Sequence, residues 1–316
     1  MRFDFFPLRF DFAAREPLYF APGKAANTLR GALGTIFRNL ACQPDCEEPR
    51  TCSLRASCPY ARIFAPESDG HGPSGLSDPP RPFVFRASHL DGRFLQPGTP
   101  FYFDLNVFTP NRDTLAFFIL SFRALASEGL GPGRGRADLL RVRRLPFGEL
   151  PELALFENLE LSDAQQFEAG PIQPATLCLE PLSAAPERIR VEFVTPTELK
   201  HDHTIAARPE FPILFGRIRD RLSTLRRLYG PGPLEVDYQG SSLRAASIRM
   251  VNCNVFRQEA ERRSSRTGQR HSIGGFVGSA EYEGDLAEFL PYLEAARWTG
   301  AGRQAVWGKG ELRIFL

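Results

Sequence analysis

The stretch FDFFPLRFDF, at residues 3–12, decides the predicted fold, because its apolar and polar side chains alternate as in a half-buried β-strand. Other stretches in the first half are rich in aromatic and β-branched residues, and two between them space apolar residues three and four apart, as amphipathic helices do. In chain order, the predicted elements are strand 3–12, helix 25–40, strand 81–88, strand 99–108, helix 113–129 and strand 136–145. This order is that of a ferredoxin-like βαββαβ unit.

The second half repeats the pattern loosely. Its predicted elements are strands 174–181 and 187–199, a helix from about 212 to 229, strands 243–258 and 271–284, helix 285–298 and the final strand 309–316. Both halves end in a helix, a Gly- and Arg-rich loop and a strand, with the loops at 128–140 and 299–314. Two such loops at one topological place indicate a duplication. We therefore predict an α+β chain of two tandem ferredoxin-like, RRM-like domains, at 1–150 and 151–316.

A cysteine-rich insertion is predicted in the first domain, from about residue 41 to residue 80. Four of the six cysteines follow the spacing C-x3-C-x5-C-x5-C, at Cys42, Cys46, Cys52 and Cys58. Four thiolates on a short segment can close a tetrahedral zinc site or hold an iron–sulfur cluster, although the C-x2-C pairs of common zinc ribbons are missing. We expect a structural zinc ion, with an iron–sulfur cluster and unligated thiols as the alternatives.

The length and net charge of the chain limit the classes of protein to which it can belong. The 316 residues suffice for two domains, and the formal net charge of +2 does not by itself indicate a nucleic-acid partner. No stretch approaches the roughly 18 consecutive apolar residues of a membrane-spanning helix, and the first residues do not resemble a signal peptide. We expect a cytoplasmic protein that does not contact a membrane.

An arginine-rich segment, FRQEAERRSSRTGQR at 256–270, suits a surface that follows a phosphate backbone. Its candidate RNA-binding residues are Arg262, Arg263, Arg266 and Arg270. The alternative is a solvated loop between two strands.

The glycine-rich loop near the end of the chain is a second candidate for RNA binding. Glycine lets the backbone come close to a ligand, so the amides of this loop could contact phosphates while two basic residues add charge. The residues concerned are Gly300, Gly302, Arg303, Gly308, Lys309 and Gly310. The alternative is a turn between a helix and an edge strand.

Histidines are the candidates for catalysis. RNA cleavage without a metal needs a base for the ribose 2′-hydroxyl, an acid for the leaving 5′-oxygen and cations around the phosphorane. His201 and His203 stand beside Lys200 between a predicted strand and a helix, and His271 adjoins the arginine-rich segment. Surface histidines without a catalytic role are the structural alternative.

Several motifs of the second half carry a family resemblance: FVTPTELK at 193–200, RRSSRTGQRHSIGGFVGSAEYEGDL at 262–286 and GAGRQAVWGKGEL at 300–312. Together they resemble the CRISPR-associated endoribonucleases of the RAMP superfamily, which process precursor CRISPR RNA. In the first half, NTLRGALGTIFRNLAC at 27–42 and CSLRASCPYARIFAP at 52–66 resemble members with a cysteine-rich insertion.

The resemblance implies binding of a CRISPR repeat RNA, metal-independent cleavage by 2′-hydroxyl attack to leave a 2′,3′-cyclic phosphate, and retention of the mature guide RNA. It also implies contacts with other CRISPR interference subunits. Many family members place a catalytic histidine on or just after the first helix, whereas residues 24–41 contain none; their cationic side chains are Lys24, Arg30 and Arg38.

Three alternatives follow for this chain. The acid and base come from Lys200 and the three histidines, or arginines such as Arg38 act through their charge, or the protein is a non-catalytic subunit that holds guide RNA. An interaction module built on the cysteine cluster is a further alternative from a different class, and it would show no salt-dependent RNA affinity.

Overall fold

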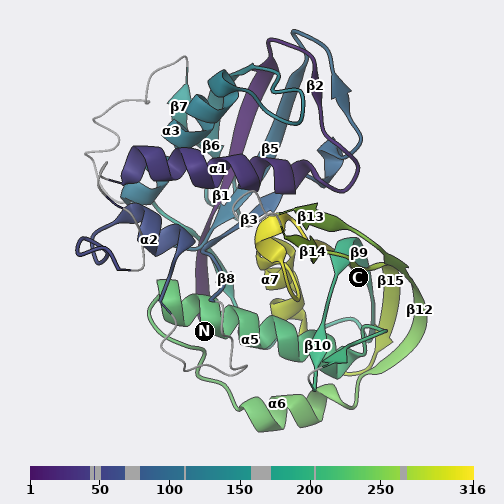
Figure 1. The fold of residues 1–316 in the computed structure, drawn as a ribbon. Helices are drawn as coiled ribbons and strands as arrows, with labels where there is room; N and C mark the ends of the chain where they lie inside the picture. The colour runs from purple at the N-terminus through teal and green to yellow at the C-terminus, as the bar shows by residue number, and fades with distance from the viewer. Residues whose placement is uncertain are drawn as a thin grey trace. The chain divides into compact units, whose positions relative to one another are not determined.

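The computed structural model describes residues 1–42, 46, 51–67, 79–109, 112–157, 172–202, 204–263 and 269–316. It is a mixed α+β fold with antiparallel sheets, shown in Figure 1. Two compact units divide the chain: one holds the described residues between Phe5 and Ala175, and the other holds Met1–Asp4 with Thr176–Leu316. No helix of the described ranges is long and apolar enough to cross a membrane.

The N-terminal unit is built on an antiparallel sheet with the strand order β3-β5-β1-β6-β7. These strands are β1 (Arg2–Ala14), β3 (Phe83–Arg86), β5 (Pro100–Val107), β6 (Ala137–Arg144) and β7 (Leu153–Glu157), and β8 (Ala175–Cys178) also pairs with β1. The main helices are α1 (Ala25–Ala41) and α3 (Arg112–Glu128). Shorter elements are β2 (Leu18–Tyr19), α2 (Pro59–Phe64), η1 (Ser88–Leu90) and β4 (Phe94–Leu95).

Phenylalanines form the core of this unit. The alternation along β1 buries Phe10 and Phe12 on one face of the sheet and leaves Arg9 and Asp11 on the other. The ring of Phe10 lies 5.2 Å from that of Phe103 on β5 and 4.8 Å from that of Phe122 on α3. Stacked and edge-on ring pairs of this kind add to the hydrophobic stabilisation, so the aromatic alternation of the first strand fixes which face α3 covers.

The C-terminal unit contains a four-stranded antiparallel sheet with the order β12-β15-β9-β16. These strands are β9 (Arg188–Thr197), β12 (Arg249–Gln258), β15 (Gly275–Glu283) and β16 (Leu312–Phe315). Helices α5 (Phe211–Tyr229) and α7 (Leu290–Thr299) pack against each other and enclose an aromatic core. Two small hairpins, β10 (Lys200–His201) with β11 (Thr204–Ile205) and β13 (Glu261–Arg263) with β14 (Arg270–Ser272), α6 (Tyr238–Ala245) and η2 (Ala305–Trp307) complete the unit.

One face of this sheet is buried under the helices. Tyr282 of β15 is fully buried, its ring lies 5.1 Å from Phe211 of α5, and its hydroxyl donates to the carbonyl of Pro209 at 2.6 Å. Phe215 of α5 contacts Phe289, with ring centres 4.7 Å apart. The opposite face of the sheet, carrying Glu281 and Glu283, is covered by neither helix.

The structure differs from the expected domain boundary between residues 150 and 151. β7 pairs with β6, and Leu155 and Phe156 are buried, so this strand belongs to the N-terminal unit and the division falls after Ala175. The predicted insertion of about 41–80 holds α2, and its loop at 68–78 lies outside the described residues.

Two predicted elements begin later than expected. The strand predicted from residue 243 begins at Arg249, because the Asp237 side chain accepts from the Gly240 amide at 2.8 Å and caps α6. A capping carboxylate of this kind favours a helix where hydrophobic alternation alone suggested a strand. The helix predicted from residue 285 begins at Leu290.

Candidate functional site

The β10–β11 hairpin presents two of the candidate catalytic residues. Lys200 and His201 pair with Ile205 and Thr204, and the hairpin contacts α5. The His201 side chain is 53% exposed, and its Nε2 lies 3.2 Å from the Asp202 carboxylate. A carboxylate beside an imidazole can orient the ring for proton transfer. His203 lies outside the described residues.

The β13–β14 hairpin carries His271 and the arginine-rich segment. His271 is half-buried and pairs with Arg262, while Arg263 pairs with Arg270. Arg270 is 76% exposed and lies 3.7 Å from Glu261, so a carboxylate balances part of its charge. The side chains of Arg262 and Arg263, and the whole of Arg266, lie outside the described part of the chain.

The glycine-rich loop contacts β14 and Glu198, a residue that precedes β10. The amide of Arg303 donates to the Glu198 carbonyl at 3.0 Å and its guanidinium to the Glu198 carboxylate at 2.6 Å, just before β10. The Gln304 side chain donates to the carbonyl of Ser272 on β14 at 2.8 Å. Glu198 and Gln304, which make these two contacts, were not predicted from the sequence.

Three of the candidate loop amides donate within the chain. Those of Gly300, Gly308 and Gly310 donate to the carbonyls of Ala296, Ala305 and Pro196, at 2.8, 3.0 and 3.1 Å. The expectation that these three amides contact phosphates is therefore corrected, because each already donates within the chain. Gly302 has a φ of +74°, and a Cβ there would lie 2.3 Å from the Glu198 carbonyl oxygen. Its glycine is required by packing.

The two basic residues of the loop differ in exposure. The Arg303 side chain is 56% exposed, whereas Lys309 is 3% exposed. The predicted surface charge of Lys309 is therefore corrected, because its side chain is inside the fold.

The α5 helix supports this loop. Arg221 donates from Nε to the carbonyl of Thr299, immediately before Gly300, at 2.9 Å.

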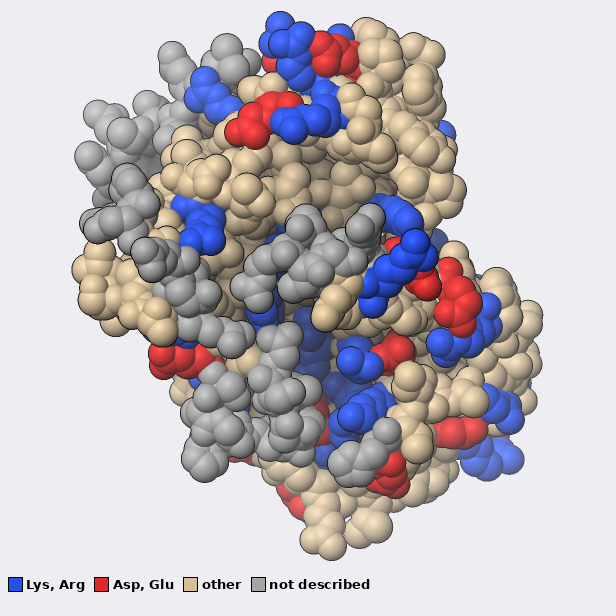
Figure 2. Space-filling model, in the orientation of Figure 1, with Lys and Arg blue, Asp and Glu red and all other residues tan. Residues whose placement is uncertain are grey.

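Figure 2 shows basic side chains gathered in the part of the view where Figure 1 places α5 and β10. Such a basic surface can attract an anionic ligand.

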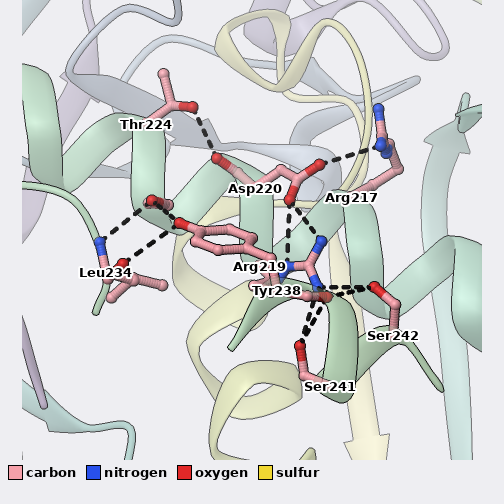
Figure 3. Close-up of polar contacts among 9 residues, drawn as sticks. Arg217, Arg219, Asp220, Thr224, Leu234, Tyr238, Ser241 and Ser242 are labelled. Atoms are coloured by element: carbon pink, nitrogen blue, oxygen red, sulfur yellow. Dashed lines mark hydrogen bonds and ion pairs between the residues drawn. The ribbon is translucent and has the colours of Figure 1, made fainter. Parts of the chain in front are cut away.

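A buried ionic network fixes α5 to α6, as Figure 3 shows. Arg219 donates to the Asp220 carboxylate at 3.0 Å, to the Tyr238 carbonyl at 2.7 Å, and to the hydroxyls of Ser241 and Ser242 at 3.0 and 2.9 Å. Arg217 approaches the same carboxylate at 3.0 Å. Buried charges require such partners. The sequence predicted the helix but not this network.

The first helix contributes no histidine to the site. Arg38, a candidate for charge stabilisation, donates to the carbonyl of Cys46 at 2.9 Å and so contacts the cysteine segment.

The four clustered cysteines contact one another. The Cys42 thiol makes side-chain contacts with Cys46 and Cys58, and Cys46 contacts Cys52. Burial, followed by the neighbouring thiols, raises the pKa of Cys42 to about 11. Within the described ranges, no group of three or more Cys, His, Asp or Glu residues is arranged to hold a metal ion. Four thiols are a donor set that can bind zinc, but their positions in this structure do not form a metal site.

Two family models match the chain, one in each of its two compact units. The N-terminal domain family AF_1859_N matches residues 3–166, and the model of the CRISPR-associated endoribonuclease Cas6 matches residues 191–312. No curated protein matches the chain.

Solved Cas6 structures share the fold. The Cas6 (TTHB231) product complex has a TM-score of 0.55 at 14% identity and covers 98% of this chain and 100% of that chain. Thermus thermophilus Cas6 (TTHB231) has a TM-score of 0.52 at 12% identity, covering 99% and 98%. The Cas6-RT-Cas1–Cas2 complex has a TM-score of 0.53 at 11% identity, covering 98% of this chain and 28% of that chain. The match over residues 191–312 and the shared fold support a CRISPR-associated endoribonuclease of the Cas6 type.

Proposed function

We propose that this protein cleaves CRISPR repeat RNA within the precursor transcript, by attack of the ribose 2′-hydroxyl and without a metal ion in the chemical step. Cleavage leaves a 2′,3′-cyclic phosphate on the fragment upstream of the cut and a 5′-hydroxyl on the fragment downstream of it. The protein retains the mature guide RNA. The observation that carries this proposal is the glycine-rich loop, because Gln304 binds the hairpin of His271 and Arg303 binds Glu198, three residues before His201. Acid, base and cations are what this cleavage requires.

The architecture that we propose is two ferredoxin-like units in tandem. In the N-terminal unit, β3-β5-β1-β6 is the order in which second, third, first and fourth strands of a βαββαβ unit pair. The order β12-β15-β9-β16 supports the same arrangement in the C-terminal unit.

His201 and His271 are our candidates for the base and the acid. Lys200, next to His201 in the chain, and Arg303, which binds Glu198, are both exposed and would stabilise the negative charge that develops on the phosphorane. His203 and Arg266 remain candidates from the sequence. Arg38 contacts the cysteine segment, which makes it the weakest of the candidates.

The test is cleavage of the cognate repeat RNA by purified protein, with EDTA added together with the RNA so that no metal is stripped beforehand. An identical RNA with one 2′-deoxy nucleotide at the cut site is the matched substrate. We expect cleavage of the first RNA only. Cleavage of the deoxy RNA at the same bond would exclude 2′-hydroxyl attack.

Histidine variants then assign the roles. We expect His201→Ala and His271→Ala to lower the single-turnover rate constant about 10²-fold or more and to leave affinity unchanged. His89→Ala is the matched control, since His89 is another exposed histidine and its Nε2 lies 2.9 Å from the Tyr102 carbonyl. A normal rate for either site variant removes that residue from the mechanism.

The second candidate function is a non-catalytic subunit that holds guide RNA. It is favoured by one observation, that residues 24–41 contain no histidine. Tight binding without cleavage of either RNA would select it. Contacts with other CRISPR subunits are part of both proposals, and one similar structure is the Cas6-RT-Cas1–Cas2 complex.

For the cysteine segment we propose a structural zinc ion held by Cys42, Cys46, Cys52 and Cys58. The contacts of Cys42 with Cys46 and Cys58, and of Cys46 with Cys52, support this donor set. Cys42 directly follows α1 and Cys58 directly precedes α2, so an ion bound there would join the two helices and stabilise the segment. An iron–sulfur cluster uses the same donors, and elemental analysis separates the two.

A further inference from the structure

We propose that the helix-free face of β12 binds the bases of a single-stranded segment of the repeat RNA, with Phe256 as the platform on which a base stacks. This inference rests on the proposed function and adds a base-binding surface to it.

The side chains on this face share one orientation. Successive residues of a strand point to opposite faces, so residues two apart point the same way. On β12 these are Asn252, Asn254, Phe256 and Gln258, and all four are exposed. β12 is the edge strand of the sheet, with β15 on one side.

The register with β15 shows which face this is. Asn252, Asn254 and Phe256 lie opposite Glu281, Ser279 and Val277. The buried residues of β15 that meet the helices, Ala280 and Tyr282, point to the other face. The four β12 side chains therefore stand on the face that α5 and α7 leave uncovered.

Phe256 is exposed without a packing reason. Its side chain is 64% exposed, although a phenylalanine ring gains free energy from burial. Bases stack on exposed aromatic rings in proteins that bind single-stranded nucleic acids. Such stacking supplies affinity with little sequence preference.

The amide side chains around Phe256 supply the complementary chemistry. Asparagine and glutamine each carry a donor and an acceptor and can pair with the edge of a base. Asn252 donates to Glu281 at 3.3 Å, which turns its amide along the sheet face. Neighbouring side chains on one face of a strand lie about 7 Å apart, a length that one step of an unstacked RNA strand can match.

The basic hairpin continues this surface. β12 ends at Gln258 and leads directly into β13, whose partner β14 begins at the exposed Arg270. Arg257, at the same end of β12, points to the other face and is paired with Glu259, so Arg270 is the cation that this hairpin adds to the surface. Phosphates held by this hairpin would place the adjoining nucleotides over Phe256.

A second copy of the chain is the competing occupant, because the outer edge of β12 is open to another strand. The exposed large apolar side chains of β12 are Val251 and Phe256. The side chains next to Phe256 on the proposed face are amides. Stable dimer interfaces have a more apolar core than this. The chemistry of the strand therefore favours RNA.

The first experiment compares Phe256→Ala, Phe256→Trp and the wild type in fluorescence anisotropy with the cognate repeat RNA. Phe94→Ala is the matched control, since Phe94 is 58% exposed on β4 of the other unit. We expect Phe256→Ala to weaken binding at least about fivefold, and Phe256→Trp and Phe94→Ala to bind as the wild type does.

A second measurement identifies the base. Single abasic sites are placed along the repeat, and the site that weakens wild-type binding should have no further effect on Phe256→Ala. Wild-type affinity of Phe256→Ala in a preparation that cleaves normally would overturn the inference and leave the proposed function intact. The inference would also be overturned if the wild-type protein were a dimer, and Phe256→Ala dissociated that dimer without changing the affinity for RNA. Absence of both binding and cleavage in the wild type would reject the proposed function itself.

Discussion

At Gly302, the backbone has a φ of +74° and passes so close to Glu198 that an added Cβ would lie 2.3 Å from its carbonyl oxygen. Non-glycine residues are strained at such a φ, and the contact adds a clash. At Gly133, in the corresponding loop of the N-terminal unit, an added Cβ would meet no atom within 4 Å, and φ lies outside the left-handed range. The first glycine is therefore required by its surroundings, whereas the second is not.

We predict that Gly302→Ala lowers the free energy of unfolding of the C-terminal unit by at least about 1–3 kcal/mol. Gly133→Ala should change stability little or raise it slightly, because it only reduces the freedom of the unfolded chain. Thermal unfolding followed by circular dichroism measures both variants. Equal effects of the two substitutions would contradict the packing role of Gly302.

Among the elements, α5 depends on the network in Figure 3. Arg219 and Asp220 are both buried, so removing the guanidinium leaves a carboxylate with fewer partners inside the fold. We predict that Arg219→Met destabilises the protein by about 3–5 kcal/mol, and that the double variant Arg219→Met, Asp220→Leu recovers part of this loss. Chemical denaturation measures the three proteins. A double variant less stable than Arg219→Met would show that the carboxylate is not the source of the loss.

The cysteine segment allows a prediction about the end of α1 and the start of α2. Cys52→Ser together with Cys58→Ser should lower bound zinc and the melting temperature together, because binding of a structural metal is coupled to folding. Cys178→Ser is the control, since Cys178 is exposed and outside the cluster. Elemental analysis and thermal unfolding provide the two readouts. Wild-type protein purified without zinc or iron would reject the metal site.

Much of the element pattern could be predicted from the sequence. The aromatic alternation of residues 3–12 forecast β1, and the helical spacing forecast α1, α3 and α5. β7 was missed because a short strand inside a polar spacer gives a weak periodic signal. The start of α6 was missed because a local cap, Asp237, outweighed the hydrophobic pattern.

The candidate site was predictable in part. The histidines and the glycine-rich loop could be identified by residue type, but the contacts that join them are made between residues far apart in the chain. Arg303 reaches Glu198 and Gln304 reaches Ser272, pairings that no local pattern encodes. For the same reason, residue type alone predicted a surface role for Lys309, which its burial rules out.

For the whole molecule, charge balance is the property that bears most on RNA binding. The chain carries a formal net charge of only +2. On the sheet of the C-terminal unit, Arg188 pairs with Glu281, Arg249 with Glu283 and Arg313 with Glu192. Such pairs leave little net field, so the affinity for RNA has to come from a few local cations.

The salt dependence of RNA affinity tests this localisation. Each phosphate contact on a single strand contributes about 0.7 to the slope of log affinity against log salt, because binding releases counterions. We predict that Arg270→Ala lowers the magnitude of the slope by about 0.7, since its side chain is exposed on the hairpin that continues the proposed RNA surface and lies 3.7 Å from the Glu261 carboxylate. Arg188→Ala should change the slope less, because its guanidinium donates two hydrogen bonds to Glu281 on β15. Filter binding between roughly 50 and 200 mM KCl, a range over which phosphate contacts change the affinity strongly, measures the slopes. An unchanged slope for Arg270→Ala would place the phosphate contacts elsewhere, and the surface around α5 and β10 would then be the next to substitute.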